Sequence, residues 1–453
     1  MRGMRKPLLS SCALALAGVV AAAACSKADS STGEHSTVDE PDAAAAKLDG
    51  SAARLDSHVA PDAPVTVGDG PTTGDPPADA ASSADAPAAF DAIAADAPTD
   101  GAAPVQGGQP IVYVAGFRAE IDVFRLDMTT STLTKVGAVA NPPMMPSFFA
   151  WDALGRFGYS VDEVVDGKLV SYSIDSHTGM LTRLNEATVM GFGPTYVSLD
   201  KTGKWALTAS WAGGKAASIA VSPIAADGRV GPPVDRRMYK VDGWAHYITT
   251  DPTNRYAFAS INGEEYVAQF KFDAATGKLT ENTPARVMRP AGAGPRHMAF
   301  HPDGKHAYLI NEHGNTVTVY GFDDGTGLLT QLQDISTLPA GYKGMSATAQ
   351  ILVHGSGKFV YGSNRGHDSV VIYAVDPGSG MLTLVGHKTG VGAFPRNFTI
   401  DPTGTLLLIA GQNDGSLTVF KIDQGTGMLA QVGKSIAVGM KPTYVGVVNV
   451  AGM

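Results

Sequence analysis

Cysteine is almost absent from this chain of 453 residues: only Cys12 and Cys25 occur, both near the N-terminus. Because the rest of the chain has no thiol, it has no disulfide, no thiolate-bound metal and no cysteine nucleophile. The sequence also lacks the Cys-x-x-Cys-His motif that attaches haem, which makes a redox function the weakest of the options.

An excess of positive charge and a membrane-spanning apolar run are missing as well. The formal net charge is −9, from 34 Lys and Arg against 43 Asp and Glu. This balance argues against a nucleic-acid-binding protein that works through a general basic surface. The apolar segment near the N-terminus, from about residue 8 to residue 24, is too short to span a bilayer comfortably.

Residues 1–25 have the pattern of a secretory signal. Three basic residues lie among the first six, the apolar segment follows, and small residues lead to Cys25. The stretch Ala22-Ala23-Ala24-Cys25 resembles a bacterial lipobox, in which Cys25 is acylated and becomes the first residue of the mature chain. Ordinary signal-peptidase cleavage is the alternative.

The lipobox predicts an exported lipoprotein in a bacterial cell envelope, held to a membrane by several acyl chains. Because Ser26 rather than Asp follows the cysteine, we expect the outer membrane, with the protein facing the periplasm or the surface. Other envelope components are then candidate partners.

Residues 26–108 consist largely of Ala, Asp, Pro, Ser, Thr and Gly, with Phe90 as the only aromatic residue. Such a segment buries too little apolar surface to offset the entropy lost on ordering. We expect a disordered acidic linker, stiffened by proline, that lifts the following domain off a membrane.

From residue 109 onward the sequence repeats itself. Each copy has an Asp, a few small residues that often include Thr-Gly, and then an apolar residue. The seven copies are Asp127–Leu133, Asp175–Leu181, Asp227–Val230, Asp273–Leu279, Asp323–Leu329, Asp376–Leu382 and Asp423–Leu429. Their apolar residues lie 47 to 53 positions apart, and this period is typical of propeller blades with four strands.

Two further patterns place the strands within each blade. A turn such as His301–Lys305 separates two strands, and an alternating strand such as residues 315–323 follows. Residues 441–448 match the first strand of a blade, whereas residues 111–139 supply a second, third and fourth strand. The sequence therefore predicts an all-β fold over residues 109–453. It is a seven-bladed β-propeller whose N- and C-terminal strands share one blade and leave no open edge strand.

The hairpin GPRHMAFHPDGKHAYLINE, residues 294–312, places charged residues at both of its ends. In an antiparallel pair, the start of the first strand and the end of the second lie at one edge. Arg296 and Glu312 are therefore expected side by side, either as a solvated rim pair or as part of a site.

Equivalent positions in the seven blades form two rings at this edge. The first ring comprises Ser147, Thr195, His246, Arg296, Ala349, Arg396 and Thr443. The second comprises Glu163, Trp211, Asn262, Glu312, Arg365, Gln412 and Phe117. Three arginines, one histidine and one glutamate fall in four consecutive blades. They suit an anionic or carbonyl-bearing small molecule, because Arg offers bidentate donors and His or Glu can activate water. A charged rim without function is the alternative.

Four blocks carry a resemblance to a known family. They are AHYITTDP (245–252), GPRHMAFHPDGKHAYLINE (294–312), GSNRG (362–366) and FPRNFTIDPTGTLLLIAGQNDGSLTVF (394–420). They resemble the seven-bladed propeller lactonases, which include 6-phosphogluconolactonase and the fungal carboxy-muconate lactonising enzyme. The similarity runs over nearly all of residues 110–450. It implies a site that opens or closes a lactone at one end of the central channel, with no metal and no cofactor.

The family's His, Arg, Glu and second Arg fall on His246, Arg296, Glu312 and Arg365. The resemblance thus implies hydrolysis of a small sugar-acid or related lactone. Arg296 and Arg365 would hold a carboxylate or polarise the carbonyl, and Glu312, helped by His246, would activate water.

Four more residues are candidate substrate contacts: Arg396, Gln412, His297 and Asn262. His297 is nevertheless expected to point away from Arg296 and to pack between blades. Because propellers host many functions, the alternative is a non-enzymatic, surface-anchored propeller that binds a glycan or a protein partner.

Overall fold

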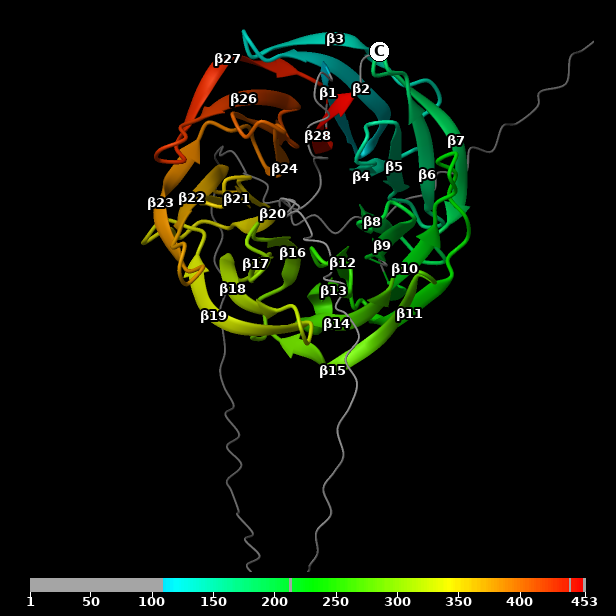
Figure 1. The fold of residues 1–453 in the computed structure, drawn as a ribbon. Helices are drawn as coiled ribbons and strands as arrows, with labels where there is room; N and C mark the ends of the chain where they lie inside the picture. The colour runs from blue at the N-terminus through cyan, green and yellow to red at the C-terminus, as the bar shows by residue number, and fades with distance from the viewer. Residues whose placement is uncertain (1–108, 212–213, 440, 451–453) are drawn as a thin grey trace, which may run out of the picture. The chain divides into compact units, whose positions relative to one another are not determined.

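The computed structural model describes residues 109–211, 214–439 and 441–450. The predictions for residues 1–108, namely the signal peptide, acylation of Cys25 and the linker, lie outside these residues. In the described ranges, 28 strands form seven four-stranded antiparallel sheets around a central axis (Figure 1). The predicted seven-bladed propeller is confirmed.

The strands occupy four ranks from the axis outward. The innermost strands are β4 Pro146–Trp151, β8 Pro194–Leu199, β12 Ala245–Thr250, β16 Pro295–Phe300, β20 Ala347–Val353, β24 Pro395–Ile400 and β28 Pro442–Val450. The second strands are β1 Gln109–Gly116, β5 Phe157–Asp162, β9 Trp205–Ser210, β13 Tyr256–Ile261, β17 His306–Asn311, β21 Phe359–Arg365 and β25 Leu406–Gly411. The third strands are β2 Arg118–Asp127, β6 Lys168–Ile174, β10 Ala216–Pro223, β14 Tyr266–Asp273, β18 Thr316–Asp323, β22 Ser369–Val375 and β26 Ser416–Ile422. The outer strands are β3 Thr132–Ala138, β7 Leu181–Thr188, β11 Asp235–Val241, β15 Lys278–Met288, β19 Leu328–Ser336, β23 Leu382–Thr389 and β27 Leu429–Ala437. One 3₁₀ turn, η1 Asn262–Glu264, follows β13.

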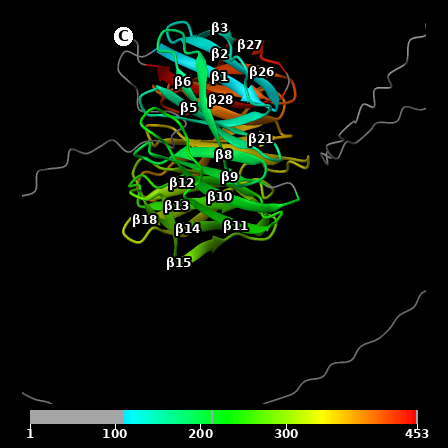
Figure 2. The same cartoon turned by 90° about the vertical axis from the view of Figure 1, so that its right-hand side faces the viewer.

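One blade is built from both ends of the described chain. Its sheet has the order β28-β1-β2-β3, and Val447 of β28 pairs with Val112 of β1. This arrangement is the predicted ring closure. It leaves β28 as an innermost strand like those of the other six blades, and Figure 2 shows the ring from the side.

The recurring turn residues are explained by their hydrogen bonds. In the inner turn after β24, Asp401 Oδ1 accepts the backbone N–H groups of Thr405 at 2.8 Å and Leu406 at 2.6 Å. In three outer turns, the carbonyl of the recurring glycine accepts a tyrosine hydroxyl from the neighbouring blade, as from Tyr361 to Gly427 at 2.8 Å. The repeat therefore closes turns and also joins blades.

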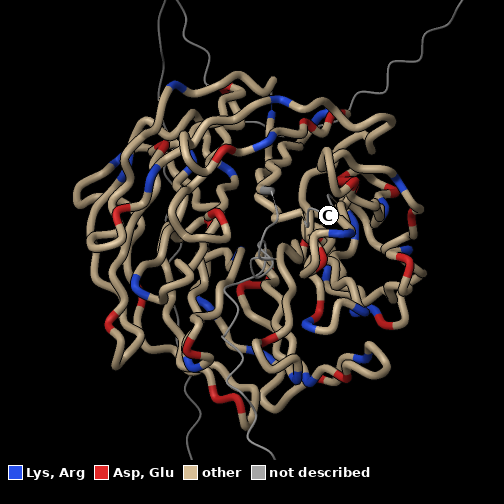
Figure 3. Tube along the Cα trace, turned by 45° about the horizontal axis from the view of Figure 1, so that its top comes forward, with Lys and Arg blue, Asp and Glu red and all other residues tan. Residues whose placement is uncertain are grey.

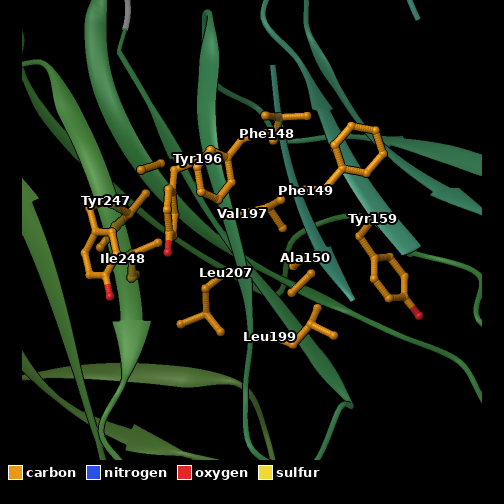
Figure 4. Packing of buried hydrophobic residues seen from close by; sticks show 14 of the residues in the cluster. Phe148, Phe149, Ala150, Tyr159, Tyr196, Val197, Leu199, Leu207, Tyr247 and Ile248 are labelled. Carbon is orange, nitrogen blue, oxygen red and sulfur yellow. The ribbon is translucent and has the colours of Figure 1, made fainter. Parts of the chain in front are cut away.

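The core lies in the three inner ranks: all six residues of strands such as β8 and β13 are buried, and so are the six central residues of the third-rank strand β10. Aromatic side chains pack where innermost strands face one another. Phe148 lies 4.4 Å from Tyr196 between ring centroids, and Tyr196 lies 4.5 Å from Tyr247 (Figure 4). Each such pair adds about 0.5–1.5 kcal/mol beyond its buried area. This packing gives the axis a rigid interior.

The outer surface carries charges of both signs. Figure 3 shows Lys and Arg interspersed with Asp and Glu around the ring. Within the part of the chain that the structure describes, no helix has the length and apolarity needed to cross a membrane.

Candidate active site

A β-bulge interrupts every innermost strand near its beginning. In β16, Pro295 pairs with Asn311 and His297 pairs with Ile310, while Arg296 between them has no partner on β17. The residues left unpaired in this way are Ser147, Thr195, His246, Arg296, Ala349, Arg396 and Thr443. These seven residues are the first ring that the sequence repeat predicted. Because a bulge re-aims a side chain, six of the seven line one hollow at the axis.

The sequence holds a signal for these bulges. Five of the seven innermost strands begin with proline, for example β16 with Pro295 and β24 with Pro395. The residue before each of these two prolines has a positive φ, +65° at Gly294 and +59° at Phe394. Proline has no N–H to donate to a ladder, so within sheets it occurs at strand starts and bulges. A proline at the same place in five repeats indicates an irregular strand start.

The hollow at the axis is narrow and lined by polar side chains. Glu163, His246, Arg296 and Arg396 line it together with smaller residues, and it encloses about 10 Å³, room for about one water molecule. Two buried polar atoms of its lining residues, His246 Nδ1 and Asn397 Nδ2, have no hydrogen-bond partner among the described residues. Buried polar groups are almost always paired, so these atoms indicate a place for a water molecule or a ligand.

Glu312 lies at the end of β17 and joins two arginines. Its Oε2 is 3.5 Å from Arg296 Nε and accepts a hydrogen bond from Asn262 Nδ2 at 3.1 Å, and its Oε1 pairs with Arg365 Nη2. Burial raises the pKa of Glu312, but Arg365 and Arg296 outweigh burial and lower this pKa to about 2. Glu312 is therefore ionised at neutral pH. The predicted contact of Arg296 with Glu312 is confirmed.

The two arginines of this network are also fixed by the backbone. Arg365 Nη2 donates to the carbonyl of Thr348 at 2.8 Å, and Arg296 Nη1 donates to that of Ala349 at 2.6 Å. The third arginine, Arg396, lies over the ring of Phe117 at 5.2 Å from its centroid. Fixed guanidinium groups make a preorganised cationic wall.

His246 is neutral in this setting. Burial lowers the pKa of His246 well below 6.5, and Arg296 and Arg396 lower it further. Its Nδ1 is among the unpaired atoms, while its ring lies 5.2 Å from that of His297. The imidazole is therefore available at neutral pH as an acceptor rather than as a cation.

The expectation that His297 packs between blades is wrong. His297 is buried, lines the same hollow, and contacts Phe148, Tyr196 and Tyr247 from three other blades. Its Nδ1 is 2.7 Å from Gln350 Oε1. The reason is the bulge at Arg296, because strict alternation would have turned consecutive residues to opposite faces. His297 thus belongs to the floor of the hollow.

The remaining second-ring candidates lie around the same axis. Asn262 binds Glu312, as described, whereas Gln412 contacts neighbouring loops through its backbone: its N–H donates to Phe394 O at 3.3 Å and its carbonyl accepts from Lys441 N at 3.0 Å. The repeat also places Glu163 in the second ring. In the structure it lines the hollow with Arg396, which opposes the rise that burial causes in the pKa of Glu163.

Potential metal ligands gather elsewhere. Among the described residues, the group of three His, Asp or Glu side chains close enough to share an ion is His301, Asp303 and His306, in the turn between β16 and β17. That turn lies at the opposite end of the strands from Arg296 and Glu312. The axial site is therefore built from guanidinium, imidazole and carboxylate groups.

The fold and the site define a class of protein: a closed seven-bladed propeller with a cationic, partly unpaired polar site on its axis. The family model described as lactonase, 7-bladed beta-propeller matches residues 111–447. The chain therefore belongs to this family of propeller lactonases, and the resemblance read from the four sequence blocks is confirmed.

Individual relatives agree with this assignment. A 6-phosphogluconolactonase of Pectobacterium carotovorum subsp. carotovorum (strain PC1) is 38% identical over 247 residues, which cover 54% of this chain and 72% of that protein. A 6-phosphogluconolactonase of Bacillus subtilis (strain 168) is 31% identical over 312 residues, covering 67% of this chain and 87% of that protein. The solved structure of a periplasmic gluconolactonase of Pseudomonas aeruginosa, PpgL, has a TM-score of 0.71 at 29% identity, covering 76% of this chain and 100% of that chain.

Proposed function

We propose that this protein hydrolyses a small lactone that binds over the axial hollow, whose space for about one water molecule would hold the attacking water. The observation that carries the proposal is the unpaired Nδ1 of the buried His246 in the same lining as the guanidinium groups of Arg296 and Arg396. Lactone hydrolysis needs a base for water, a donor for the developing oxyanion and an attraction for the carboxylate product. Membership of the lactonase family supports this reaction class.

In the proposed mechanism, His246 Nδ1 takes a proton from a water molecule as the water oxygen attacks the lactone carbonyl carbon. The carbonyl oxygen gains negative charge, which the guanidinium groups of Arg296 and Arg396 stabilise. The ring C–O bond then breaks, and the departing alkoxide recovers the proton from His246. The product is an open-chain hydroxy acid.

Glu312 has a positioning role in this mechanism. A carboxylate whose pKa is about 2 is a weak base for water, so His246 is better suited to take the proton. Because Glu312 binds both Arg296 and Arg365, its removal would loosen the two guanidinium groups. Arg365, Arg396, Gln412, Asn262 and His297 would contact or bound the substrate.

The relatives and the N-terminus support a substrate class and a location. The periplasmic gluconolactonase PpgL supports a sugar-acid lactone and an exported protein. The signal-like first 25 residues support export too, and acylation of Cys25 would anchor the propeller to the cell envelope. The phosphorylated lactone of the 6-phosphogluconolactonases is the other substrate to compare.

Proton release during hydrolysis tests the proposal. The full chain is assayed in a pH-stat with aldonolactones, sugar-phosphate lactones and muconolactones, and spontaneous hydrolysis is subtracted. We expect turnover of the aldonolactones, reduced at least about 100-fold in His246→Asn, since removing a general base costs about 10²–10⁴-fold. Circular dichroism confirms that the variant is folded. No turnover of any lactone, or equal turnover in the variant, would make a non-enzymatic binding propeller the better conclusion.

A further inference from the structure

The turn between β16 and β17 carries a second cluster of titratable groups, away from the axial site. One ligand atom each from His301, Asp303 and His306 lies within 4.8 Å of the others. His301 is five positions after Arg296 along the extended strand β16, which corresponds to about 17 Å. The cluster is therefore independent of the proposed lactone site.

The hydrogen bonds of His301 determine which nitrogen carries its proton. Its Nε2 is 2.8 Å from the carbonyl oxygen of Gly357, which only accepts, so the N–H is on Nε2. Its Nδ1 consequently has a lone pair, which faces the backbone N–H of Asp303 at 3.2 Å and Asp303 Oδ1 at 3.1 Å. Asp303 Oδ1 also accepts the backbone N–H groups of Lys305 at 2.7 Å and His306 at 3.2 Å. With the imidazole neutral, no hydrogen lies between Nδ1 and Oδ1, so a cation there would contact two lone pairs.

The next blade provides a natural comparison. His354 occupies the same turn position, and its Nε2 is 2.7 Å from the carbonyl oxygen of Gly404. Its Nδ1, however, is 2.8 Å from the hydroxyl of Ser356, which can donate. A histidine in this turn thus has a complete hydrogen-bond arrangement when its partner is serine. Asp303 replaces that donor by a second acceptor.

His306 is the other unusual residue. Its position at the start of the second strand holds bulky apolar residues in other blades: Phe157, Trp205, Tyr256, Phe359 and Leu406. Packing alone therefore does not require an imidazole there. The ring of His306 lies against Gly380, where a Cβ atom would come within 2.3 Å of it, and its Nδ1 is 2.7 Å from Asp303 Oδ2.

We propose that His301, Asp303 and His306 form a binding site for a divalent transition-metal ion, with Zn²⁺ as the expected ion. Two imidazole nitrogens and a carboxylate oxygen are ligands that Zn²⁺ accepts at about 2.0–2.2 Å, with water completing the coordination at this partly exposed turn. The bond from His301 Nε2–H to a backbone carbonyl is the outer contact that typically orients a metal-binding histidine. Because metal ligands bind in their deprotonated form, affinity is expected to fall as the pH is lowered.

Calorimetric titration of the EDTA-treated full chain with ZnCl₂ at pH 7.5 tests the site. The matched variants are Asp303→Ser and His306→Phe, which introduce the residues of the neighbouring blade and so preserve a turn known to fold in this protein. We expect one ion per chain and a loss of affinity of more than about tenfold in each variant, since even an outer partner of a metal ligand contributes about 10–100-fold. Zn²⁺ binding that is absent, or unchanged in both variants, would overturn the proposal.

A gain of binding gives a second, independent test. Ser356→Asp combined with Phe359→His places the same three residue types around His354 in the next blade. We expect the number of Zn²⁺ ions bound to rise from one to two per chain. If the number stays at one while the variant keeps its native circular dichroism, this set of residues does not suffice to bind the ion, and the assignment is wrong.

Discussion

Replacing Glu312 by Gln is the sharpest test of how the axial charges are balanced. Glu312 links Arg296 and Arg365, and its side chain is 15% exposed, so solvent screens these ion pairs weakly. Its pKa falls from 4.5 to about 2 on folding. At 1.36 kcal/mol per pKa unit, this shift amounts to about 3 kcal/mol of folding free energy at neutral pH.

The sign of the pH dependence follows from the direction of this shift. A carboxylate with a lowered pKa in the folded state stabilises the protein above its unfolded pKa and loses that effect as the pH falls toward the folded pKa. The contribution of Glu312 is thus about 3 kcal/mol at pH 7 and about half of that at pH 3. Below pH 2 most of it is gone.

Urea denaturation of the full chain and of Glu312→Gln at pH 7 and pH 3 measures this difference. Subtracting the two free energies of unfolding at each pH cancels the titration of all other carboxylates. Glu281→Gln is the matched control, because Glu281 is exposed on β15, and we expect a change within about 0.5 kcal/mol at both pH values. A difference for Glu312→Gln that does not change with pH, or that stays within 0.5 kcal/mol, would refute the reasoning.

Three further outcomes are expected. Arg296→Lys should lower kcat/KM for a hydrolysed lactone about 10²–10³-fold, because it removes a donor to the developing oxyanion. If initial-rate measurements show less than a tenfold loss, Arg296 does not stabilise the oxyanion. Because the pKa of His246 lies well below 6.5, kcat/KM should be flat from pH 7 to 8 and decline only below pH 6.5; a decline that begins above pH 7 excludes His246 as the base. Tyr361→Phe leaves the Gly427 carbonyl without its buried donor and should cost about 1–3 kcal/mol in urea denaturation. Tyr342→Phe, whose hydroxyl makes only long contacts of 3.3 and 3.4 Å, should change it by less than about 0.5 kcal/mol.

The fold could be predicted from the sequence because the same strand and turn patterns recur in every blade. Each blade carries the same two turns, so errors in one copy are corrected by the other six, and the incomplete copies at both ends predict the shared blade. The contact of Arg296 with Glu312 followed in the same way from antiparallel pairing. Local turn chemistry and pairing rules were sufficient for both.

Interactions between side chains of different blades were harder to predict from the sequence. The repeat places Glu163 and Arg396 in rings, but which side chains meet over the axis depends on bulge geometry and side-chain length. The ionisation of Glu312 and of His246 depends likewise on burial and on charges from several blades. His297 was misplaced for a related reason, because alternation was applied through a bulge that only the recurring proline indicates.

The bulges also explain how one repeated fold can carry a particular chemistry at one face. A residue in a regular ladder has its side chain fixed to one face, and a shift in register would move every later side chain to the other face. A bulge residue is outside the ladder, so its side chain can change without disturbing the pairs on either side. The ring accordingly holds small residues such as Ser147 and Thr195 beside His246 and Arg296 in blades with the same pairing. Substrate preference within such a propeller is therefore expected to vary through these seven positions while the blades stay the same.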